Sequence, residues 1–199
     1  RIEAHANRIG VVNTIKAEGG KLIGYNTEYS AAVELLGRHA KGDPPSVLII
    51  GTGGAGRSIA AAASDMGFKT FICGSNLERT TKVSRSLGSG IGTIPLQSVT
   101  RMKGKVSVLV NATPGSLAKI EGRNETKMSV SEIARFLEPS VGIDVVYSSS
   151  WTSFLSSVES RGGTPISGFD MLASEVVEAH KLWTGTGPDL ESLRKCAIE

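Results

Sequence analysis

The chain has 199 residues, 40% of them hydrophobic and 21% charged, which is typical of a folded globular protein. Its net charge of +3, with no basic run, argues against nucleic acid or an acidic membrane surface as direct partners. No apolar run approaches the roughly 20 residues that cross a bilayer.

The first 45 residues predict a small unit of their own. Segments 11–16 and 21–24 resemble two strands that meet at Gly19-Gly20, and segment 28–38 resembles a helix. The stretch 41–45 contains glycine and two prolines and is typical of a linker. We therefore expect a boundary just before residue 46.

From residue 46 onward, the sequence alternates strand-like and helix-like segments. Strands are predicted at 47–50, 70–73, 106–110, 141–146 and 164–166, and helices at 58–66, 77–87, 129–137, 151–160, 169–183 and after Pro188. Ser129 and Glu132 have the spacing of a capping box. This alternation predicts an α/β fold with a doubly wound parallel sheet.

The helix predicted at 169–183 has a one-sided apolar pattern that indicates a buried face. We expect that face to contain Phe169, Leu172, Ala173, Val176, Ala179, His180 and Trp183. Phe169 and Trp183 are interpreted as core residues rather than ligand contacts.

The segment from Gly51 to Gly56 fits the pattern G-x-G-x-x-G between a buried strand and an alanine-rich helix. Gly51 permits the tight turn, Gly53 lets the backbone approach a pyrophosphate, and Gly56 allows close packing. The exposed N–H groups that follow, which include Gly54 and Ala55, favour phosphate. We therefore predict a Rossmann-type dinucleotide site; a glycine-rich turn without a ligand is the alternative.

The positions that would bind the adenosine end of a dinucleotide are Gly74, Ser75 and Asn76. None is acidic, as an NAD ribose would require, and none is an arginine that could hold a 2′-phosphate. The nearest arginine is Arg79, one helical turn later. Ser75 and Asn76 also suit a turn and a helix cap, so both interpretations stay open.

The cysteines and histidines predict no metal site. Cys73 and Cys196 lie far apart, and the three histidines form no cluster with ligand spacing.

Six motifs, in order and over nearly the whole chain, resemble those of the shikimate/quinate dehydrogenase family. They are I-G-V-V-N-T-I at 9–15, G-Y-N-T-E at 24–28, the glycine loop, N-A-T-P at 111–114, D-V-V-Y at 144–147 and S-G-F-D-M-L at 167–172. L-W-T-G at 182–185 also resembles the family's C-terminal end.

The resemblance implies two domains. Residues 1–40 would be the incomplete end of a substrate domain that binds shikimate, 46–187 the Rossmann dinucleotide-binding domain, and 188–199 a C-terminal helix or tail. Residue 1 is not methionine. The family's catalytic lysine would belong to residues upstream, so we expect this fragment alone to be inactive.

The implied activity is the NADP-dependent interconversion of 3-dehydroshikimate and shikimate in cytoplasmic aromatic amino-acid biosynthesis. Glu28 occupies the position of the family's catalytic aspartate. Asn13, Tyr147 and Glu175 would contact shikimate, 3-dehydroshikimate or quinate. Asn111 and Thr113 would also bind the cofactor, and Gly168 would present its backbone to the nicotinamide.

Four departures from the family pattern bear on this function. Glu28 replaces aspartate and Glu175 replaces glutamine, while Gly74-Ser75-Asn76 replaces Asn-Arg-Thr and Ser116-Leu117 replaces a glycine–methionine pair. They keep two alternatives open. One is a non-catalytic dehydrogenase-like domain of a fungal quinate-pathway repressor, which would act in the nucleus; the other is a quinate dehydrogenase that uses NAD.

Each substrate-site residue also has a purely structural interpretation. Asn13 could bond backbone at a strand end, and Glu28 could complement a helix dipole. Tyr147 could be an amphipathic residue at a strand end, and Glu175 a solvated side chain.

Overall fold

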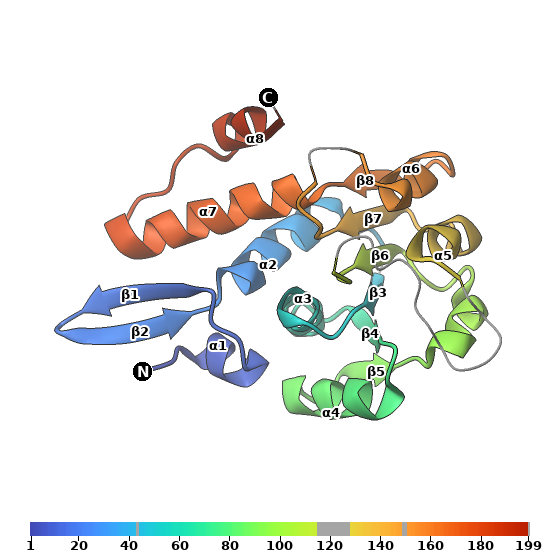
Figure 1. Ribbon diagram of the computed structural model, residues 1–199, viewed down its shortest axis with the longest axis horizontal. Coiled ribbons are helices and arrows are strands. Elements are labelled where there is room, and N and C mark those ends of the chain that lie inside the picture. Colours follow the sequence, from blue (N-terminus) through green and yellow to red (C-terminus); the bar gives the residue numbers. More distant parts are fainter. Residues whose placement is uncertain (43, 115–127, 149–150, 199) are drawn as a thin grey trace.

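The computed structural model describes residues 1–42, 44–114, 128–148 and 151–198 (Figure 1). Within these ranges, a six-stranded parallel sheet has the order β5-β4-β3-β6-β7-β8. The strands are β3 (Ser46–Ile50), β4 (Lys69–Cys73), β5 (Ile91–Thr93), β6 (Val108–Asn111), β7 (Val141–Asp144) and β8 (Thr164–Ile166). The order reverses between β3 and β6, as in a Rossmann fold. The predicted fold class is confirmed.

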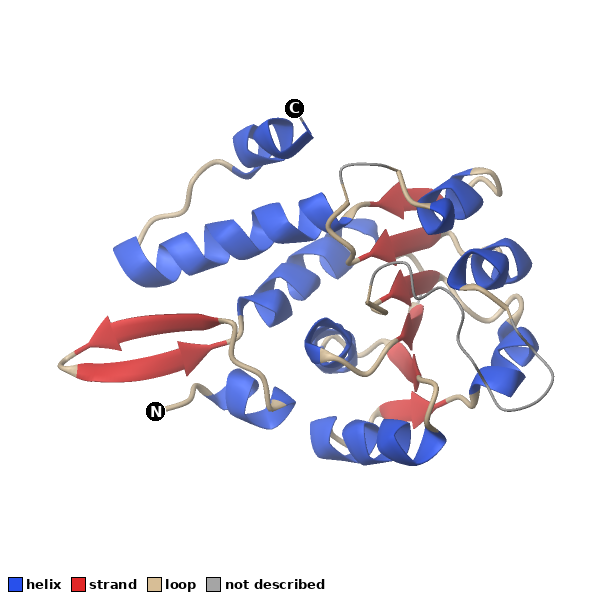
Figure 2. Ribbon diagram, viewed as in Figure 1, coloured by secondary structure: helices blue, strands red, loops and turns tan. Residues whose placement is uncertain are grey.

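Helices cover both faces of the sheet (Figure 2). One face carries α2 (Thr27–His39), α3 (Gly54–Asp65), α4 (Leu77–Leu87) and α7 (Gly168–Thr184); the other carries the 3-10 helix η1 (Leu96–Met102), α5 (Val130–Leu137) and α6 (Ser153–Glu159). In β3, Val47 and Ile49 face the first layer, and Leu48 and Ile50 face the second. All four are 0% exposed, which explains the unbroken apolar run.

The N-terminal part contains α1 (Ala4–Ile9) and a hairpin of β1 (Thr14–Glu18) and β2 (Lys21–Tyr25). The hairpin turns at Gly19 and Gly20, whose φ angles are +55° and +73°, as the sequence predicts. The first strand begins at Thr14 rather than at residue 11. Val11 instead lies beside Gly54 of the glycine loop, 3.3 Å from where a Cβ would be.

Other predicted boundaries agree closely with the structure, with two corrections. Helix α3 begins at Gly54 rather than at residue 58, because first-turn N–H groups need no intrahelical partner and tolerate glycine. Strand β7 ends at Asp144 rather than at residue 146, because the Asp144 carboxylate accepts the Val146 N–H at 3.2 Å and turns the chain. The capping box of α5 is confirmed.

The predicted buried face of α7 is wrong in part. Ala173 and Ala179 are buried, but Trp183 is 56% and Val176 42% exposed, and the other buried residues of this helix are Gly168, Met171, Ser174 and Val177. The reason is that α7 packs against α2, where the Ser174 hydroxyl donates to Glu34 at 2.7 Å.

Two features connect the periphery to the body. The Trp183 indole N–H donates to the Ile15 carbonyl oxygen at 3.0 Å, which joins the end of α7 to the projecting hairpin (Figure 1). Helix α8 (Leu190–Ile198) packs on α7.

No helix in the described ranges is long and apolar enough to span a membrane. Residue 43 of the predicted linker lies outside the described residues.

Candidate functional site

The glycine loop joins β3 to α3 at the carboxyl edge of the sheet. Gly51 has a φ of +125°, and a Cβ there would overlap the Ala112 carbonyl oxygen. A Cβ at Gly56 would overlap the carbonyl oxygen of Gly51. At Gly53, by contrast, no described atom lies within 4 Å of the Cβ position. Packing therefore requires glycine at positions 51 and 56, whereas the space beside Gly53 is open.

That open space fits the diphosphate of a dinucleotide. Gly53 is the N-cap of α3 and offers no side-chain acceptor to the N–H groups of Gly54 and Ala55. Free N–H groups and the positive end of the helix dipole together favour an anion. The loop could therefore hold the diphosphate of NADP or NAD.

The junction between β4 and α4 would receive the adenosine end. Asn76 is the N-cap of α4, and its Oδ1 accepts the Arg79 N–H at 2.8 Å. Ser75, Asn76 and Arg79 are all exposed. Among the described residues, none forms a hydrogen bond or ion pair with the Arg79 guanidinium. Asn76 thus has the capping role that its structural alternative predicts, while the Arg79 side chain is exposed.

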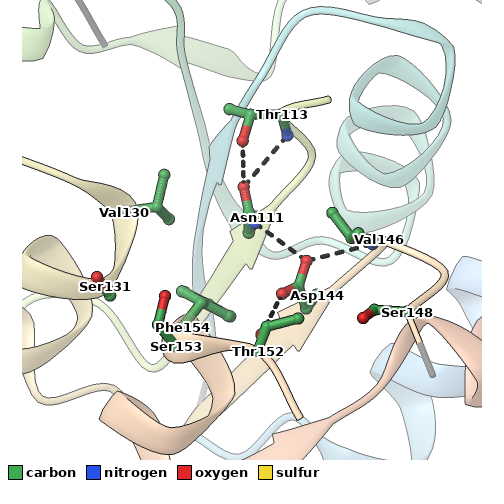
Figure 3. Close-up of a pocket in the computed structure, with 10 residues that line it drawn as sticks. All are labelled: Asn111, Thr113, Val130, Ser131, Asp144, Val146, Ser148, Thr152, Ser153 and Phe154. Carbon is green, nitrogen blue, oxygen red and sulfur yellow. Dashed lines mark hydrogen bonds between the residues drawn. The ribbon is translucent and has the colours of Figure 1, made fainter. Parts of the chain in front are cut away.

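Asn111 and Thr113 form a hydrogen-bond network with Asp144 at the ends of β6 and β7 (Figure 3). The Asn111 amide donates to Asp144 at 3.0 Å, and its Oδ1 accepts the Thr113 hydroxyl at 2.6 Å. The buried Asp144 also accepts the Thr152 hydroxyl at 2.6 Å. Burial raises the pKa of Asp144, and its hydrogen bonds oppose that rise.

This network lines a hollow of about 220 Å³ between the starts of α5 and α6 (Figure 3). Both the side-chain nitrogen and the side-chain oxygen of Asn111 form hydrogen bonds in this network. The described contacts of Asn111 therefore hold together the carboxyl edge of the sheet. Sequence reasoning did not single out Asp144 and Thr152, although Asp144 begins the D-V-V-Y motif. The Ser116-Leu117 pair lies outside the described residues.

Gly168 begins α7 beside the same edge. It is buried, and a Cβ there would overlap the Val146 carbonyl oxygen. Only glycine therefore fits this contact between α7 and the segment after β7.

Glu28 reaches the glycine loop from the first turn of α2. Its Oε2 accepts the Ser58 hydroxyl at 2.9 Å and lies 3.8 Å from where a Gly54 Cβ would be. Burial raises the pKa of Glu28, and the hydrogen bond from Ser58 opposes that rise. Ser58 is fully buried, and sequence reasoning missed it; its signal is a hydroxyl near the start of an alanine-rich helix, just after the loop.

Glu175 and Tyr147 lie together with Glu28. The Tyr147 hydroxyl donates to Glu175 Oε1 at 3.2 Å. Burial and the charge of Glu28 raise the pKa of Glu175 to about 7, and burial also raises the pKa of Tyr147. The structure thus brings together residues from α2, α7 and the segment after β7.

Asn13 lies beside the same helix start. Its Oδ1 accepts the Thr27 N–H at 2.8 Å, as the structural alternative for this residue predicts. The amide nitrogen consequently faces the other way and has no hydrogen-bond partner in the described part of the chain. Asn13 can therefore hold the start of α2 and still donate to a ligand.

The parallel sheet and the glycine loop at its carboxyl edge define a Rossmann-fold protein with the architecture of nucleotide-dependent dehydrogenases. No protein-family model matches the chain. It is 34% identical to shikimate dehydrogenase (NADP+) of Pyrococcus abyssi over 195 residues, 98% of this chain and 69% of that protein. Identity to a Thermus thermophilus enzyme of the same name is 32% over 200 residues, 98% of this chain and 70% of the relative.

Solved structures agree. Shikimate 5-dehydrogenase from Thermus thermophilus, in complex with NADP(H) and shikimate, matches with a TM-score of 0.81 and 30% identity, over 98% of this chain and 70% of that one. The chain belongs to the shikimate dehydrogenase family.

Proposed function

We propose that the protein is an NADP-dependent shikimate dehydrogenase, which interconverts 3-dehydroshikimate and shikimate. The observation that carries the proposal is the position of Glu28. The Glu28 carboxylate lies beside Gly54 of the phosphate-binding loop. It is held there by a hydrogen bond from Ser58, which lies on α3 as Gly54 does. An acid–base group and a dinucleotide site therefore adjoin, as the oxidation of a hydroxyl requires.

In this proposal, each residue of the cluster has one role. The hydride would be supplied or accepted by the nicotinamide of NADP, once it is bound. The Glu28 carboxylate takes up the proton of the substrate hydroxyl. Burial raises the pKa of Glu28 toward neutral pH, which suits a general base. The Asn13 amide donates to a substrate hydroxyl, while Tyr147 and Glu175 orient the ring.

We further propose the domain assignment that this function implies. Residues 1–40 complete a substrate-binding domain, residues 46–187 hold the cofactor, and residues 188–199 form a tail over α7. In this assignment, the hydrogen bond from Ser58 to Glu28 joins the two domains at the site itself.

We propose Arg79 as the contact for the 2′-phosphate of NADP, because it is exposed and free of described partners. Calorimetric titration of Arg79→Ala should show NADP⁺ binding weakened about tenfold or more, since a charged hydrogen bond contributes roughly 1.5–3 kcal/mol. NAD⁺ binding should not change. Arg85→Ala, at an exposed arginine of the same helix, is the matched control. An equal loss for both nucleotides, or no loss, would contradict this role.

Activity is tested with the full-length protein, shikimate and NADP⁺, with NADPH formation followed by absorbance. Turnover that is lost in Glu28→Gln supports the enzyme. The non-catalytic, ligand-sensing alternative is favoured by one observation: residues 74–76 contribute no cation, and Asn76 caps α4. Shikimate binding without turnover by the folded protein would establish that alternative instead.

A further inference from the structure

Two carboxyl groups of the proposed substrate site are close enough for their charges to interact. Glu28 comes from α2 and Glu175 from α7, two helices that pack against each other. Both side chains are half-buried. Ser58 holds the first at 2.9 Å, and Tyr147 contacts the second at 3.2 Å.

The surroundings of these two carboxyl groups differ. The Glu28 carboxylate accepts from the fully buried Ser58 hydroxyl, which stabilises its ionised form. Glu175 also accepts a hydrogen bond, from the 52% exposed Tyr147, which lowers its pKa, but burial and the charge of Glu28 outweigh that effect and destabilise its ionised form. Two carboxylates that share a half-buried space resist joint ionisation, so the first proton stays on the less stabilised group. Burial and Glu28 accordingly raise the pKa of Glu175 to about 7.

Among the described side chains, the arginines and the lysine of the elements that pack most closely on α7 are paired with carboxylates other than Glu175. These elements are α2, α8 and β1. The described pairs are Arg38 with Glu34 at 2.6 Å, Arg194 with Asp170 at 3.3 Å, and Lys16 with Glu18 at 3.1 Å. The titratable groups that act on Glu175 are thus Glu28 from α2 and Tyr147 from the segment after β7.

We propose that Glu175 is a specificity-determining residue that enters the substrate complex protonated and donates a hydrogen bond to an oxygen of a hydroxylated, anionic ring acid. This inference rests on the proposed function. An ionised glutamate can only accept hydrogen bonds and repels an anion, whereas its protonated form can donate. Substrate binding above neutral pH must then take up one proton from solvent.

The test is calorimetric titration of shikimate into the full-length protein saturated with NADP⁺, from pH 5.5 to 8.5, in two buffers of different ionisation enthalpy. Above pH 7, the affinity of the wild type should fall about tenfold per pH unit, with proton uptake that approaches one. Glu175→Gln keeps a donor but cannot ionise, so its affinity should stay level with no uptake. Glu178→Gln, on the same helix and paired with Lys181, should behave like wild type.

The outcomes separate the inference from the proposed function. If shikimate binds without proton uptake in the wild type, Glu175 binds as an ion and the inference is wrong. It is also wrong if Glu175→Gln takes up as many protons as the wild type, because another group then titrates. If the folded wild type binds neither NADP⁺ nor shikimate at any pH, the proposed function fails, and this inference with it.

Discussion

Burial raises the pKa of three carboxyl groups at the carboxyl edge of the sheet, those of Glu28, Asp144 and Glu175. A carboxyl group whose pKa is higher in the folded state binds its proton more tightly when folded. Its contribution to stability is therefore present at low pH and is lost as pH rises. For Glu175 the loss extends from pH 4.5, the ordinary value, to about 7.

Glu175→Gln should accordingly make the protein more stable above pH 7 and leave stability nearly unchanged at pH 4.5. Each pKa unit corresponds to about 1.4 kcal/mol, and partial exposure reduces the total, so we expect a gain of about 1–3 kcal/mol. Urea denaturation at pH 4.5 and pH 8 measures it, with Glu178→Gln as the control. An equal effect at both pH values would show that the charge of Glu175 is not the cause.

At the scale of elements, the turn from β3 into α3 assigns different duties to glycines only three residues apart. Gly56 presses against the backbone of Gly51, while the space over Gly53 is open. The contact of Gly56 with Gly51 determines whether the turn forms, whereas the open space at Gly53 leaves room for a phosphate. Stability and binding can therefore be separated within one loop.

Gly56→Ala should lower the free energy of unfolding by about 1–3 kcal/mol, because its methyl group overlaps backbone that cannot yield. Gly53→Ala should change stability by only about 0.5 kcal/mol. We expect it to weaken NADP⁺ binding about tenfold or more, because its methyl group occupies the phosphate space. Urea denaturation and calorimetric titration of both variants check the pair. Wild-type affinity in Gly53→Ala would place the diphosphate elsewhere.

The elements that the sequence predicts well are those with a strong local pattern. The apolar run of β3 and the Ser129–Glu132 capping box carry their own signal. Helix α1, strand β5 and the 3-10 helix η1 are not predicted, because short segments bury too few residues to show a period. The face of α7 is misassigned because its burial depends on α2, a partner that the local sequence does not contain.

The candidate site divides in the same way. The family resemblance indicates Glu28, Tyr147 and Glu175, and the structure places them together. The contact of Ser58 with Glu28 spans 30 residues of sequence and depends on how α3 packs beside α2. The shared environment of Glu28 and Glu175 likewise exists only in the folded chain. Sequence can therefore identify the groups, but their ionisation follows from the fold.

On the scale of the whole molecule, the hairpin of β1 and β2 is attached to the body at few points. One is the hydrogen bond from Trp183 on α7 to Ile15. Another is Asn13, whose carboxamide holds the start of α2 through Thr27. The same short segment thus carries Asn13, which we propose as a substrate contact, and the attachment that keeps it in place.

Trp183→Phe removes the indole donor and keeps an aromatic ring, so it should loosen the hairpin without unfolding the sheet. Hydrogen exchange of the β1 and β2 amides should accelerate about 3- to 10-fold, the effect of losing one hydrogen bond of roughly 1 kcal/mol. Mass spectrometry of labelled peptides measures it. Trp151→Phe, at an exposed tryptophan before α6, should leave hairpin exchange unchanged. Faster exchange throughout the sheet would contradict a local role.

The two edges of the parallel sheet also differ in how readily their sequence can change. The chain enters β4, β6 and β8 at the edge opposite the site, near Gly67, Gly104 and Gly162. Each of these glycines has a positive φ and open space around its Cβ position. Evolution can lengthen or replace these turns while the reactive groups keep their positions. In this fold, new sequence can accumulate at one edge while chemistry is conserved at the other.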